Sequence, residues 1–319
     1  MTDAMPDVIA IVLNYRRPDQ TIRCVASLKK SMGDPIRILV VDNSPGDGSG
    51  AKIRNAHPDV EVHQSGRNEG YTGGMNSGMN RALAIGAEYF LLLNSDTEVE
   101  PEFVQKLVRA LRSRPRAAAA TGTIRYAGVT DRAWYAGGSQ QTWRASAFTA
   151  HRYPGEKDIA DGVVRSVTFI SGCAFLVRSV VVRKLGPFDN RFFMYVEDAE
   201  FFSRLLSAGH ELLYVPGAMI DHHAGDDSLT PTRLYYSVRN RLLFLEVSTR
   251  GATRVCGRAY LALTTLFKIC WWSVSDTGHV RAAWAGFRDY LDGNFYAGAG
   301  PDLGRGGGTA IRTGHGETT

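Results

Sequence analysis

The sequence predicts an α/β protein in which helices cover both faces of a mostly parallel central sheet, followed by a C-terminal helical appendage. Up to residue 116, short apolar runs alternate with amphipathic segments, as expected of strands that alternate with helices. The runs at 8–13, 36–41 and 89–93 are almost entirely apolar, which is typical of parallel strands buried on both faces. Beyond residue 229 the pattern is helical, at 234–247 and 254–273.

The opening segment predicts a strand, a helix and a second strand. Val8 to Leu13 forms the first strand, and an amphipathic helix is expected over 19–30. The second strand, 36–41, ends in Asp42 and a glycine-rich loop. A strand that ends in this way is positioned to bind a ligand at the carboxyl edge of an open sheet. The alternative role for Asp42 is a local Asx turn. A third short strand is expected at 60–63.

A glycine-rich segment, 67–78, follows the third strand. Its four glycines allow close approach of the backbone to a ligand. The segment leads into a helix expected at 79–86, whose N-terminus would favour an anion. It matches neither the phosphate-binding pattern that ends in Gly-Lys-Ser/Thr nor the pattern Gly-x-Gly-x-x-Gly. A plain glycine-rich turn is the alternative interpretation.

Polar residues follow the strand at 89–93. Asn94, Ser95 and Asp96 stand at its end, where carboxylate oxygens can hold a hard cation. A strand-end cap is the alternative role for Asp96. Further along, the sequence predicts a helix at 102–112, a strand at 117–124, an irregular substrate-shaping region at 126–164 and strand character at 167–177.

Two adjacent acids, Glu197 and Asp198, follow an aromatic run and open a helical pattern that ends at a glycine. Acids in the first turn are favoured by the helix dipole, so a first-turn charge pair is one interpretation. A carboxylate beside aromatic residues could instead serve as a general base. After a strand expected at 211–215 comes the pair His222-His223, in which either imidazole could bind a metal.

Charge is distributed unevenly along the chain. The whole chain carries a net charge of +5, and residues 229–296 alone hold nine Arg or Lys against four acids. Three of the five tryptophans lie in the same segment. Basic residues with aromatics favour an anionic membrane surface over nucleic acid, because no nucleic-acid motif accompanies them. Core packing or a dimer face, and thus a homo-oligomer, is the alternative.

The compartment is also indicated by the sequence. Four scattered cysteines without a Cys-x-x-Cys pair predict a reducing environment. No basic region precedes the first apolar run, which argues against a signal peptide. No apolar run approaches the ~18 residues that a membrane span requires. We therefore expect a cytoplasmic protein that contacts the inner face of the cytoplasmic membrane peripherally.

Taken together, the motifs between Val8 and Leu245 resemble those of the family 2 glycosyltransferases, in particular the bacterial rhamnosyltransferase-like branch. Each motif is weak alone, but the set occurs in the family's order. The motifs are Asn14-Tyr15, Asp42-Asn43-Ser44, Asn68-x-Gly70, Gly73-Gly74-x-Asn76-x-Gly78, Leu93-Asn94-Ser95-Asp96, Ser171-Gly172-Cys173-Ala174-Phe175, Gly186-Pro187-Phe188-Asp189, Phe192-Phe193, Glu197-Asp198, Pro216, His222 and Arg239-Asn240.

The resemblance implies a GT-A fold, a nucleotide-diphosphate-sugar donor, a divalent cation (Mg²⁺ or Mn²⁺) and inversion at the anomeric carbon. Asp198 looks like the general base, with Glu197 beside it. Asp96 looks like the second acid of the family's Asp-x-Asp metal motif, and His222 is similar to the family's histidine near the cation. Asn94 departs from the first acid of that motif, which weakens the metal site. The donor-binding residues that the resemblance implies are Asn14, Asp42, Asn68, Gly70, Asn76, Asn94 and Ser95.

The sequence therefore predicts three segments of the chain and a single enzymatic activity. Residues 1–228 would form the nucleotide-sugar-binding and catalytic domain, 229–297 a set of basic, aromatic helices that dock on a membrane surface, and 298–319 a disordered tail. The activity would be transfer of rhamnose from a dTDP- or UDP-linked donor to a hydroxyl of a cell-surface glycan or polyprenyl-linked precursor. Alternatives are galactofuranose, N-acetylglucosamine or mannose as the sugar, and a non-catalytic scaffold. A nucleotidyltransferase is disfavoured because its glycine-rich, basic opening motif is missing.

Overall fold

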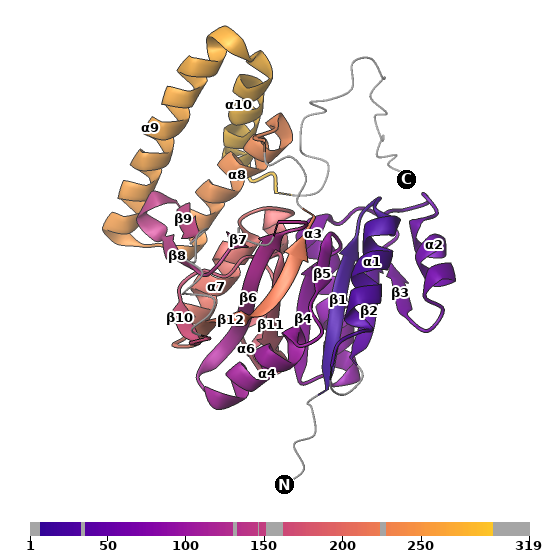
Figure 1. Ribbon diagram of the computed structural model, residues 1–319. Helices are drawn as coiled ribbons and strands as arrows, with labels where there is room; N and C mark the ends of the chain where they lie inside the picture. Colours follow the sequence, from indigo (N-terminus) through magenta and orange to yellow (C-terminus); the bar gives the residue numbers. More distant parts are fainter. Residues whose placement is uncertain are drawn as a thin grey trace, which may run out of the picture.

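The computed structural model describes residues 7–32, 36–129, 133–145, 147–150, 162–223 and 228–295. The predicted tail, 298–319, lies outside them. The strands are β1 (Val8–Asn14), β2 (Arg37–Asp42), β3 (Glu61–Gln64), β4 (Tyr89–Asn94), β5 (Thr97–Val99), β6 (Ala117–Tyr126), β7 (Ala133–Tyr135), β8 (Gly138–Gln141), β9 (Ala147–Ala150), β10 (Arg165–Val167), β11 (Ala174–Arg178) and β12 (Glu211–His222). The central sheet has the order β10-β12-β6-β11-β4-β1-β2-β3, and β8 pairs with β9 in a separate hairpin (Figure 1).

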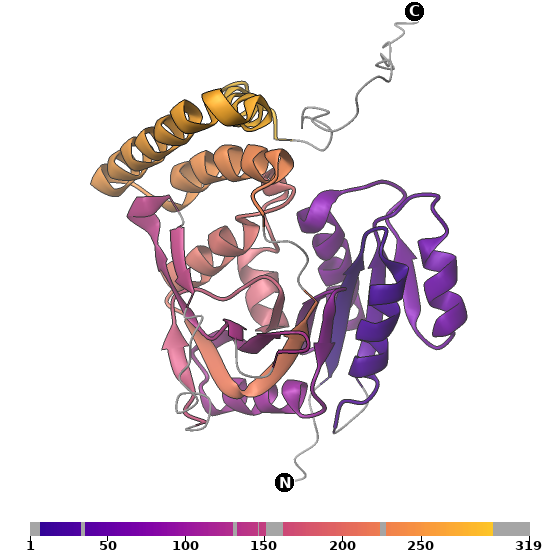
Figure 2. The ribbon, with the colours of Figure 1, turned by 45° about the horizontal axis from the view of Figure 1, so that its top comes forward.

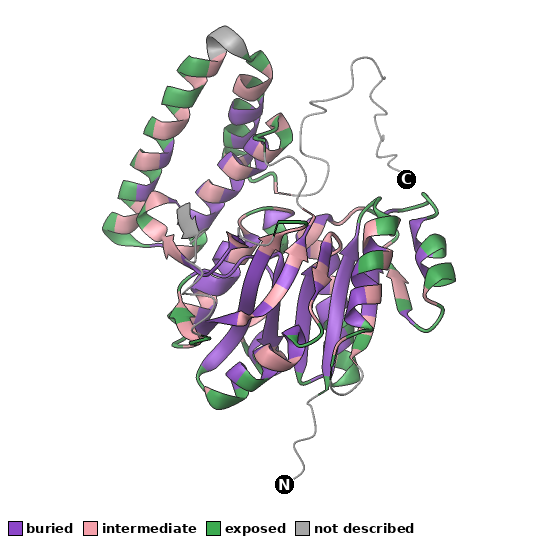
Figure 3. Ribbon diagram, viewed as in Figure 1, coloured by how far each residue is buried: buried purple, intermediate pink, exposed green. Residues whose placement is uncertain are grey.

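Helices cover both faces of this sheet, as predicted. The α-helices are α1 (Pro18–Leu28), α2 (Ser49–Ala56), α3 (Gly70–Ile85), α4 (Phe103–Ser113), α6 (Ser179–Leu185), α7 (Glu197–Ser207), α8 (Pro231–Ser248), α9 (Gly251–Ser275) and α10 (Thr277–Leu291), with 3-10 turns η1 (Thr142–Arg144) and η2 (Asn190–Phe192). Alternate residues of β1 point to opposite faces. Ala10 and Val12 join the core under α1 and α4, whereas Ile9 and Ile11 join the core under α3 and α7. Figure 3 shows these two layers as the buried residues around the sheet, and a third buried cluster lies among the C-terminal helices.

Strand direction divides the sheet into two halves. β1 pairs in parallel with β2 and β4, and β2 with β3. The antiparallel strand β11 lies between β4 and β6. Because β11 runs opposite to β4, the turn that precedes β11 lies at the edge where β4 ends, and the Asn94 amide donates to the Cys173 carbonyl there (2.9 Å). This edge therefore collects residues from both halves of the chain.

The glycine-rich segment differs from its prediction as a loop that leads to a helix at 79–86. Helix α3 already begins at Gly70. A Cβ at Gly74 would lie 2.5 Å from Leu13 Cδ1, and one at Gly78 would lie 2.4 Å from Ile11 Cγ2. These two glycines therefore let the helix pack closely on β1, and they do not form a ligand loop.

Three further elements differ from expectation. The strand character expected at 167–177 is divided between β10 and β11, with a turn around Gly172 between them. β12 does not end at Val215 but continues to His222, and its pairing with β6 is irregular at the position of Pro216. A proline is tolerated at such an irregularity because no ladder hydrogen bond is required of it. Helix α10 lies within the helices expected over 229–297, but its own bounds were not predicted.

The C-terminal helices stand at one end of the sheet (Figure 1). α8 contacts α7 and η2, and α10 packs along α8. Figure 2 shows α9 and α10 as an outer layer over α8. In the part of the chain that is described, no helix is long and apolar enough to cross a membrane.

Candidate functional site

The carboxyl ends of β1 and β2 bring Asn14 and Asp42 together. The two residues are paired across the strands, and Asn14 Nδ2 donates to Asp42 Oδ1 (2.8 Å). The hydroxyl of Thr21 donates to Asn14 Oδ1 (2.8 Å), and the Ser44 amide donates to Asp42 Oδ1 (3.2 Å). These bonds orient a carboxylate that is only 2% exposed. The predicted Asn14–Asp42 pair thus forms a rigid polar corner.

Asn68 and Gly70 lie beside this corner. Asn43 Nδ2 donates to Asn68 Oδ1 (3.2 Å) and to the Gly70 carbonyl (2.9 Å). Gly70 has a φ of +71°, and a Cβ there would lie 2.4 Å from the Phe193 carbonyl oxygen. Only glycine fits this position. Gly70 therefore joins the predicted donor side to the loop that precedes α7.

The amide of Asn76 is engaged with another part of the chain. Its Nδ2 donates to the Phe188 carbonyl (2.8 Å) and to Asn190 Oδ1 (2.7 Å), and the Phe188 amide donates to its Oδ1 (3.0 Å). In this structure Asn76 therefore holds the turn before η2 in place. Asn94 and Ser95 are half-buried at the end of β4, beside Asp96.

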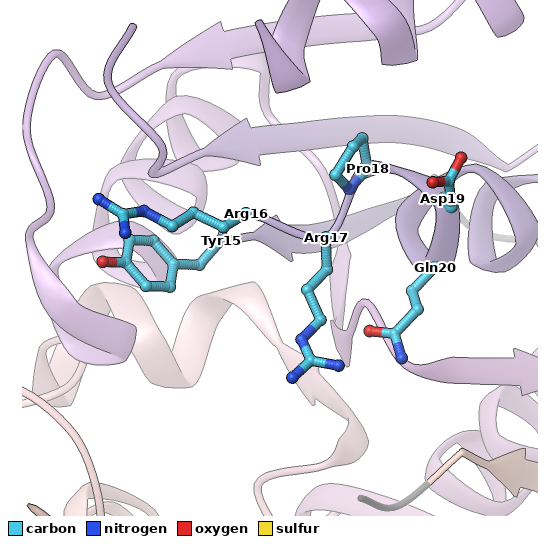
Figure 4. A pocket seen from close by; sticks show the side chains of 6 residues that line it. All are labelled: Tyr15, Arg16, Arg17, Pro18, Asp19 and Gln20. Carbon is cyan, nitrogen blue, oxygen red and sulfur yellow. The ribbon is translucent and has the colours of Figure 1, made fainter. Parts of the chain in front are cut away.

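An open hollow lies at the loop between β1 and α1 (Figure 4). It is lined by the consecutive residues Tyr15 to Gln20. The guanidinium of Arg16 lies 5.3 Å from the Tyr15 ring, and the side chains of Arg17 and Gln20 extend into the same space. Of these residues, the sequence analysis singled out Tyr15 alone, as part of the motif Asn14-Tyr15. Two guanidinium groups give this hollow a positive charge next to Asn14.

Asp96 and His222 lie at the same edge of the sheet, although they are far apart in the sequence. β12 pairs with β5, so that His222 lies opposite Thr97, and the His223 amide donates to the Asp96 carbonyl (2.8 Å). His222 Nε2 lies 3.4 Å from Asp96 Oδ1. Burial opposes a charge on His222, but Cys173 and Asp96 outweigh it and raise its pKa to about 10. This raised pKa favours the protonated imidazole beside Asp96 and Cys173.

The Asp96–His222 pair fits a divalent cation that shares its coordination with a ligand. Asp96 Oδ1 and His222 Nδ1 are buried and make no hydrogen bond within the described structure. Nowhere in the described ranges do three or more His, Cys, Asp or Glu side chains gather as a metal cluster. A carboxylate and an imidazole alone leave coordination positions for substrate oxygens, as is usual for Mg²⁺ at phosphate sites. His223 instead pairs with Glu98 (Nε2 to Oε1, 2.8 Å).

Glu197 and Asp198 open α7, as predicted, and differ in their surroundings. Asp198 is half-buried, and its carboxylate accepts from the Gly172 amide (3.0 Å) and the Ala199 amide (2.7 Å). Burial raises the pKa of Asp198, and these amides oppose the rise. Glu197 is buried, with no hydrogen bond to its Oε2. Burial and the charge of Asp198 raise the pKa of Glu197 well above its usual value. Asp198 is therefore the acid that ionises first.

The loop before α7 has an unusual backbone. Phe193, Tyr195 and Val196 have φ values of 60°, 66° and 73°, in the left-handed region that non-glycine residues rarely adopt. Asn240 Nδ2, on α8, donates to the carbonyls of Phe192 (2.7 Å), Met194 (2.8 Å) and Tyr195 (2.7 Å). Strain of this kind persists only where neighbouring groups determine the conformation.

Arg239, beside Asn240, also bonds to the backbone before α7. We call the side chains of Arg239 and Asn240 the clamp. Its side chain is fully buried, and its Nη2 donates to the Phe192 carbonyl (3.1 Å) while its Nε donates to Asn240 Oδ1 (3.0 Å). The guanidinium lies 5.0 Å from the centre of the Tyr236 ring. The motif Arg239-Asn240 thus orients the backbone immediately before Glu197.

Tyr71 is a site residue that the sequence analysis missed. Its hydroxyl donates to the Gly172 carbonyl (2.7 Å). Burial, followed by the nearby acids Glu197 and Asp198, raises its pKa well above its usual value, and Asp96 contributes in the same direction. Tyr71 is therefore bonded to the same residue, Gly172, whose amide donates to Asp198. The only sequence signal was its position one residue after Gly70.

Trp134 lies beside the Asp96–His222 pair. Its ring meets the His222 ring edge-on at 5.0 Å between centroids. The structure therefore gives Trp134 a packing contact with this imidazole.

Comparison with known proteins gives the family. Residues 9–186, more than half of the chain, match the family model of Glycosyl transferase family 2. The chain is 28% identical over 250 residues to the N-acetylglucosaminyl-diphospho-decaprenol L-rhamnosyltransferase of Mycobacterium tuberculosis, covering 70% of this chain and 77% of that protein. It is 25% identical over 252 residues to the dTDP-rhamnosyl transferase RfbF of Shigella flexneri (75% and 80% covered). The galactofuranosyltransferase GlfT1 of M. tuberculosis is 25% identical over 226 residues (70% and 72% covered).

Solved structures show the same fold. GalNAc-T7 with UDP, GalNAc and Mn²⁺ superposes with a TM-score of 0.61 at 17% identity, over 74% of this chain and about half (48%) of that chain. The mannosyltransferase PcManGT of Pyrobaculum calidifontis, with GDP-Man and Mn²⁺, gives a TM-score of 0.55 at 12% identity, over 91% and 78% of the two chains. The GT-A fold implied by the sequence motifs is confirmed. The protein belongs to glycosyl transferase family 2.

Proposed function

We propose that this glycosyltransferase transfers rhamnose, with inversion, from a dTDP- or UDP-linked donor to a hydroxyl of a polyprenyl-linked precursor or cell-surface glycan. Two of its relatives are rhamnosyltransferases, and the name of one of them contains a diphospho-decaprenol acceptor. The observation that carries the proposal is the half-buried Asp198 carboxylate, which is fixed by two backbone amides beside the buried Glu197. The acceptor would be reached at the cytoplasmic face of the membrane.

The donor would bind along the carboxyl ends of β1, β2 and β4. Asp42, oriented by Asn14, is suited to accept hydrogen bonds from a base or ribose. Asn68, Gly70 and Asn76 would shape this side through the contacts described above, and Asn94 and Ser95 would line its far end. Arg16 and Arg17 at the neighbouring hollow would favour an anionic diphosphate by charge.

Asp96 and His222 would hold Mg²⁺ or Mn²⁺ together with oxygens of the donor diphosphate. When bound, such a cation neutralises the negative charge that builds on a leaving diphosphate. The pairing of these side chains across β5 and β12 supports this assignment. Because Asn94 occupies the position of a first acid, the protein supplies few anionic ligands, and we expect the cation to bind with the donor rather than before it.

Asp198 would accept the proton of the attacking hydroxyl. A base must be ionised and held in reach of that proton. Burial raises the pKa of Asp198, but the Gly172 and Ala199 amides oppose this rise and favour its ionised form, whereas burial and the charge of Asp198 raise the pKa of Glu197 well above its usual value. A single displacement by the acceptor inverts the anomeric carbon and needs one base only, because the diphosphate leaves without protonation.

Galactofuranose is the second candidate sugar, because GlfT1 matches the chain over a similar span. N-acetylglucosamine or mannose, or a scaffold that binds nucleotide sugars without transfer, would remain if neither sugar is accepted. The residues that shape the sugar pocket include the segment 126–164, part of which lies outside the described residues.

A donor panel tests the proposal. Melting temperature would be measured with dTDP-rhamnose, UDP-galactofuranose, UDP-N-acetylglucosamine and GDP-mannose, each with and without Mg²⁺ or Mn²⁺. A ligand that binds only the folded state raises its melting temperature. We expect a cation-dependent rise with dTDP-rhamnose that Asp96→Ala abolishes. Asp198→Asn should keep this rise and lose about 10²–10⁴-fold in transfer. Stabilisation by another donor alone would reject rhamnose, and near-normal transfer by Asp198→Asn would remove Asp198 as the base.

A further inference from the structure

Helix α9 exposes large apolar side chains along its length. Val255 is 67% exposed, Leu263 68%, Leu266 59% and Phe267 74%. At 100° per residue these side chains fall on one half of the helix. The exposed small residues of α9 at 256, 259, 262 and 270 fall on that half as well. We call this half the apolar face of α9.

Charged residues lie elsewhere on α9. Its basic residues, Arg254, Arg258 and Lys268, all fall on the other half at the same helical spacing. Its 25 residues include no acid. The same half carries Leu261, Ile269 and Trp272, which pack into the core of the C-terminal helices. A helix whose exposed half is apolar and whose charged residues are all basic has the composition of helices that lie in a membrane interface.

Helix α10 adds a second apolar stripe. Trp284 is 59% exposed, Phe287 40% and Leu291 65%, at positions i, i+3 and i+7. Its buried side is formed by small residues, with Ala282, Ala283, Ala285 and Gly286 packed inward. The large apolar residues of α10 therefore point outward, the reverse of an ordinary surface helix. The exposed residues Arg281 and Arg288 flank the stripe.

We propose that the α9–α10 hairpin docks on an anionic lipid bilayer, with its apolar side chains at the acyl boundary and its arginines at the headgroups. Single exposed apolar residues are common on proteins, but two adjacent helices with apolar outer faces mark an interaction surface. The basic edges favour anionic headgroups as the occupant. A second copy of the chain would bring the basic edges of two α9 helices together without an acid on that helix to offset them.

The hairpin is connected to the catalytic body on the side of α7. Arg144, in η1, donates to the Tyr260 hydroxyl of α9 (3.1 Å), and α10 packs on α8, which carries Asn240. Docking would therefore hold the end of the site that contains Asp198 near the lipid surface. Only this last step rests on the proposed function, because vesicle binding requires no donor or acceptor.

Vesicle flotation of the full chain tests the docking. Vesicles of phosphatidylcholine alone would be compared with vesicles that also contain phosphatidylglycerol. We expect flotation with the anionic vesicles, weakened by salt. The double variant Leu266→Asp/Phe267→Asp should bind about tenfold or more weakly, and Arg281→Gln/Arg288→Gln should lose the preference for anionic lipid. Val180→Asp, at a residue of α6 that is 62% exposed, is the matched control and should float like the wild type.

Two results would overturn the proposal. One is wild-type protein that floats with neither vesicle. The other is a dimer, seen by light scattering, that the α9 variant converts to a monomer, which would assign the face to self-association. Melting temperatures and the donor-induced shift would be measured for every variant. If the double variant melts early, Phe267→Ala replaces it. A failed donor panel with retained flotation would reject the proposed function and leave the docking intact.

Discussion

Glu197 and Asp198 are neighbours in the chain, but the fold gives them different proton affinities. Asp198 receives two backbone amides, whereas the carboxyl of Glu197 is buried with an unbonded oxygen. A group that is neutral in the folded state needs no charge for its role. The neutral carboxyl of Glu197 would then contribute through its packing and polarity. Its ionisation in the unfolded chain would lower the free energy of unfolding.

The variant Glu197→Gln separates these roles. Because the folded protein retains a proton that the unfolded chain loses above the ordinary pKa of 4.5, wild-type stability should fall as pH rises above that value. Gln removes this cost. We expect the melting temperature of Glu197→Gln to exceed that of the wild type by a margin that grows with pH and vanishes below pH 4.5, with transfer retained within about tenfold.

Melting curves across pH, with the exposed Glu88→Gln as control, check this expectation. A margin that does not change with pH would mean that Glu197 is ionised in the folded protein. Loss of transfer as large as that of Asp198→Asn would assign the base to Glu197.

The sequence indicated which acids matter, but it did not show the groups that surround each of them. Only the family resemblance grouped Asp96 with His222, which the structure places 3.4 Å apart (Oδ1 to Nε2). Tyr71 could not be found, because its importance depends on a bond to the Gly172 carbonyl, 101 positions away. Contacts of this kind come from strand order, which local patterns do not encode.

The element that determines the direction of α7 is the strained loop from Phe193 to Val196. Asn240 alone donates to three of the carbonyls in and next to this loop. Each left-handed non-glycine residue costs about 1–3 kcal/mol, so that the loop would relax without its partners. The helix that carries the clamp is thus also a support for the first turn of α7.

We therefore expect Asn240→Ala to lower the free energy of unfolding by about 3 kcal/mol, because buried carbonyls lose their donors. Transfer should fall about tenfold or more as Asp198 moves, while the donor-induced melting shift, which depends on β1 and β2, persists. Chemical denaturation and kcat measurement check this, with Asn55→Ala on the exposed side of α2 as control. A variant with lower stability but unchanged kcat would limit the clamp to folding.

Periodicity found most helices and strands, and its failures have physical causes. At α3 the glycines predict a loop because glycine is a poor helix former. Their use appears only when Leu13 and Ile11 of β1 are seen against Gly74 and Gly78. At α10 the buried side consists of small residues and the large apolar residues face outward, so that the usual amphipathic signal is reversed.

For the whole molecule, the C-terminal helices and the catalytic sheet form a continuous packed structure. Gly286 of α10 lies against the backbone of α8, where a Cβ would meet the Tyr235 carbonyl at 2.5 Å, and Asp289 accepts from the Tyr235 hydroxyl (2.7 Å). Leu245 is fully buried beneath α9 and α10. Helices α8, α9 and α10, which were expected as an appendage, are therefore also part of the support for the site.

A chain that ends at Ser248 should melt roughly 5–10 °C lower than the full chain, because α8 loses apolar cover and Tyr235 loses its acceptor. Calorimetry measures the difference. A chain that ends at Phe295 keeps all described residues and is the control. An unchanged melting temperature in the shorter chain would show that α9 and α10 are an independent attachment, and would make truncation preferable to point variants for the lipid experiment.

The position of β12 has a consequence for protein synthesis. Asp96 follows β4, whereas His222 ends β12, which is the last strand of the sheet in chain order. The two side chains can therefore meet only after β12 has joined the sheet. Domains begin to fold as the chain leaves the ribosome, at about 5–20 residues per second. A nascent chain that already contains the Asn14–Asp42 corner therefore still lacks the imidazole, and it has only one of the two proposed cation ligands until translation has passed His222. Because Glu197 and Asp198 precede His222 in the chain, the proposed cation site forms only after the proposed base has been made.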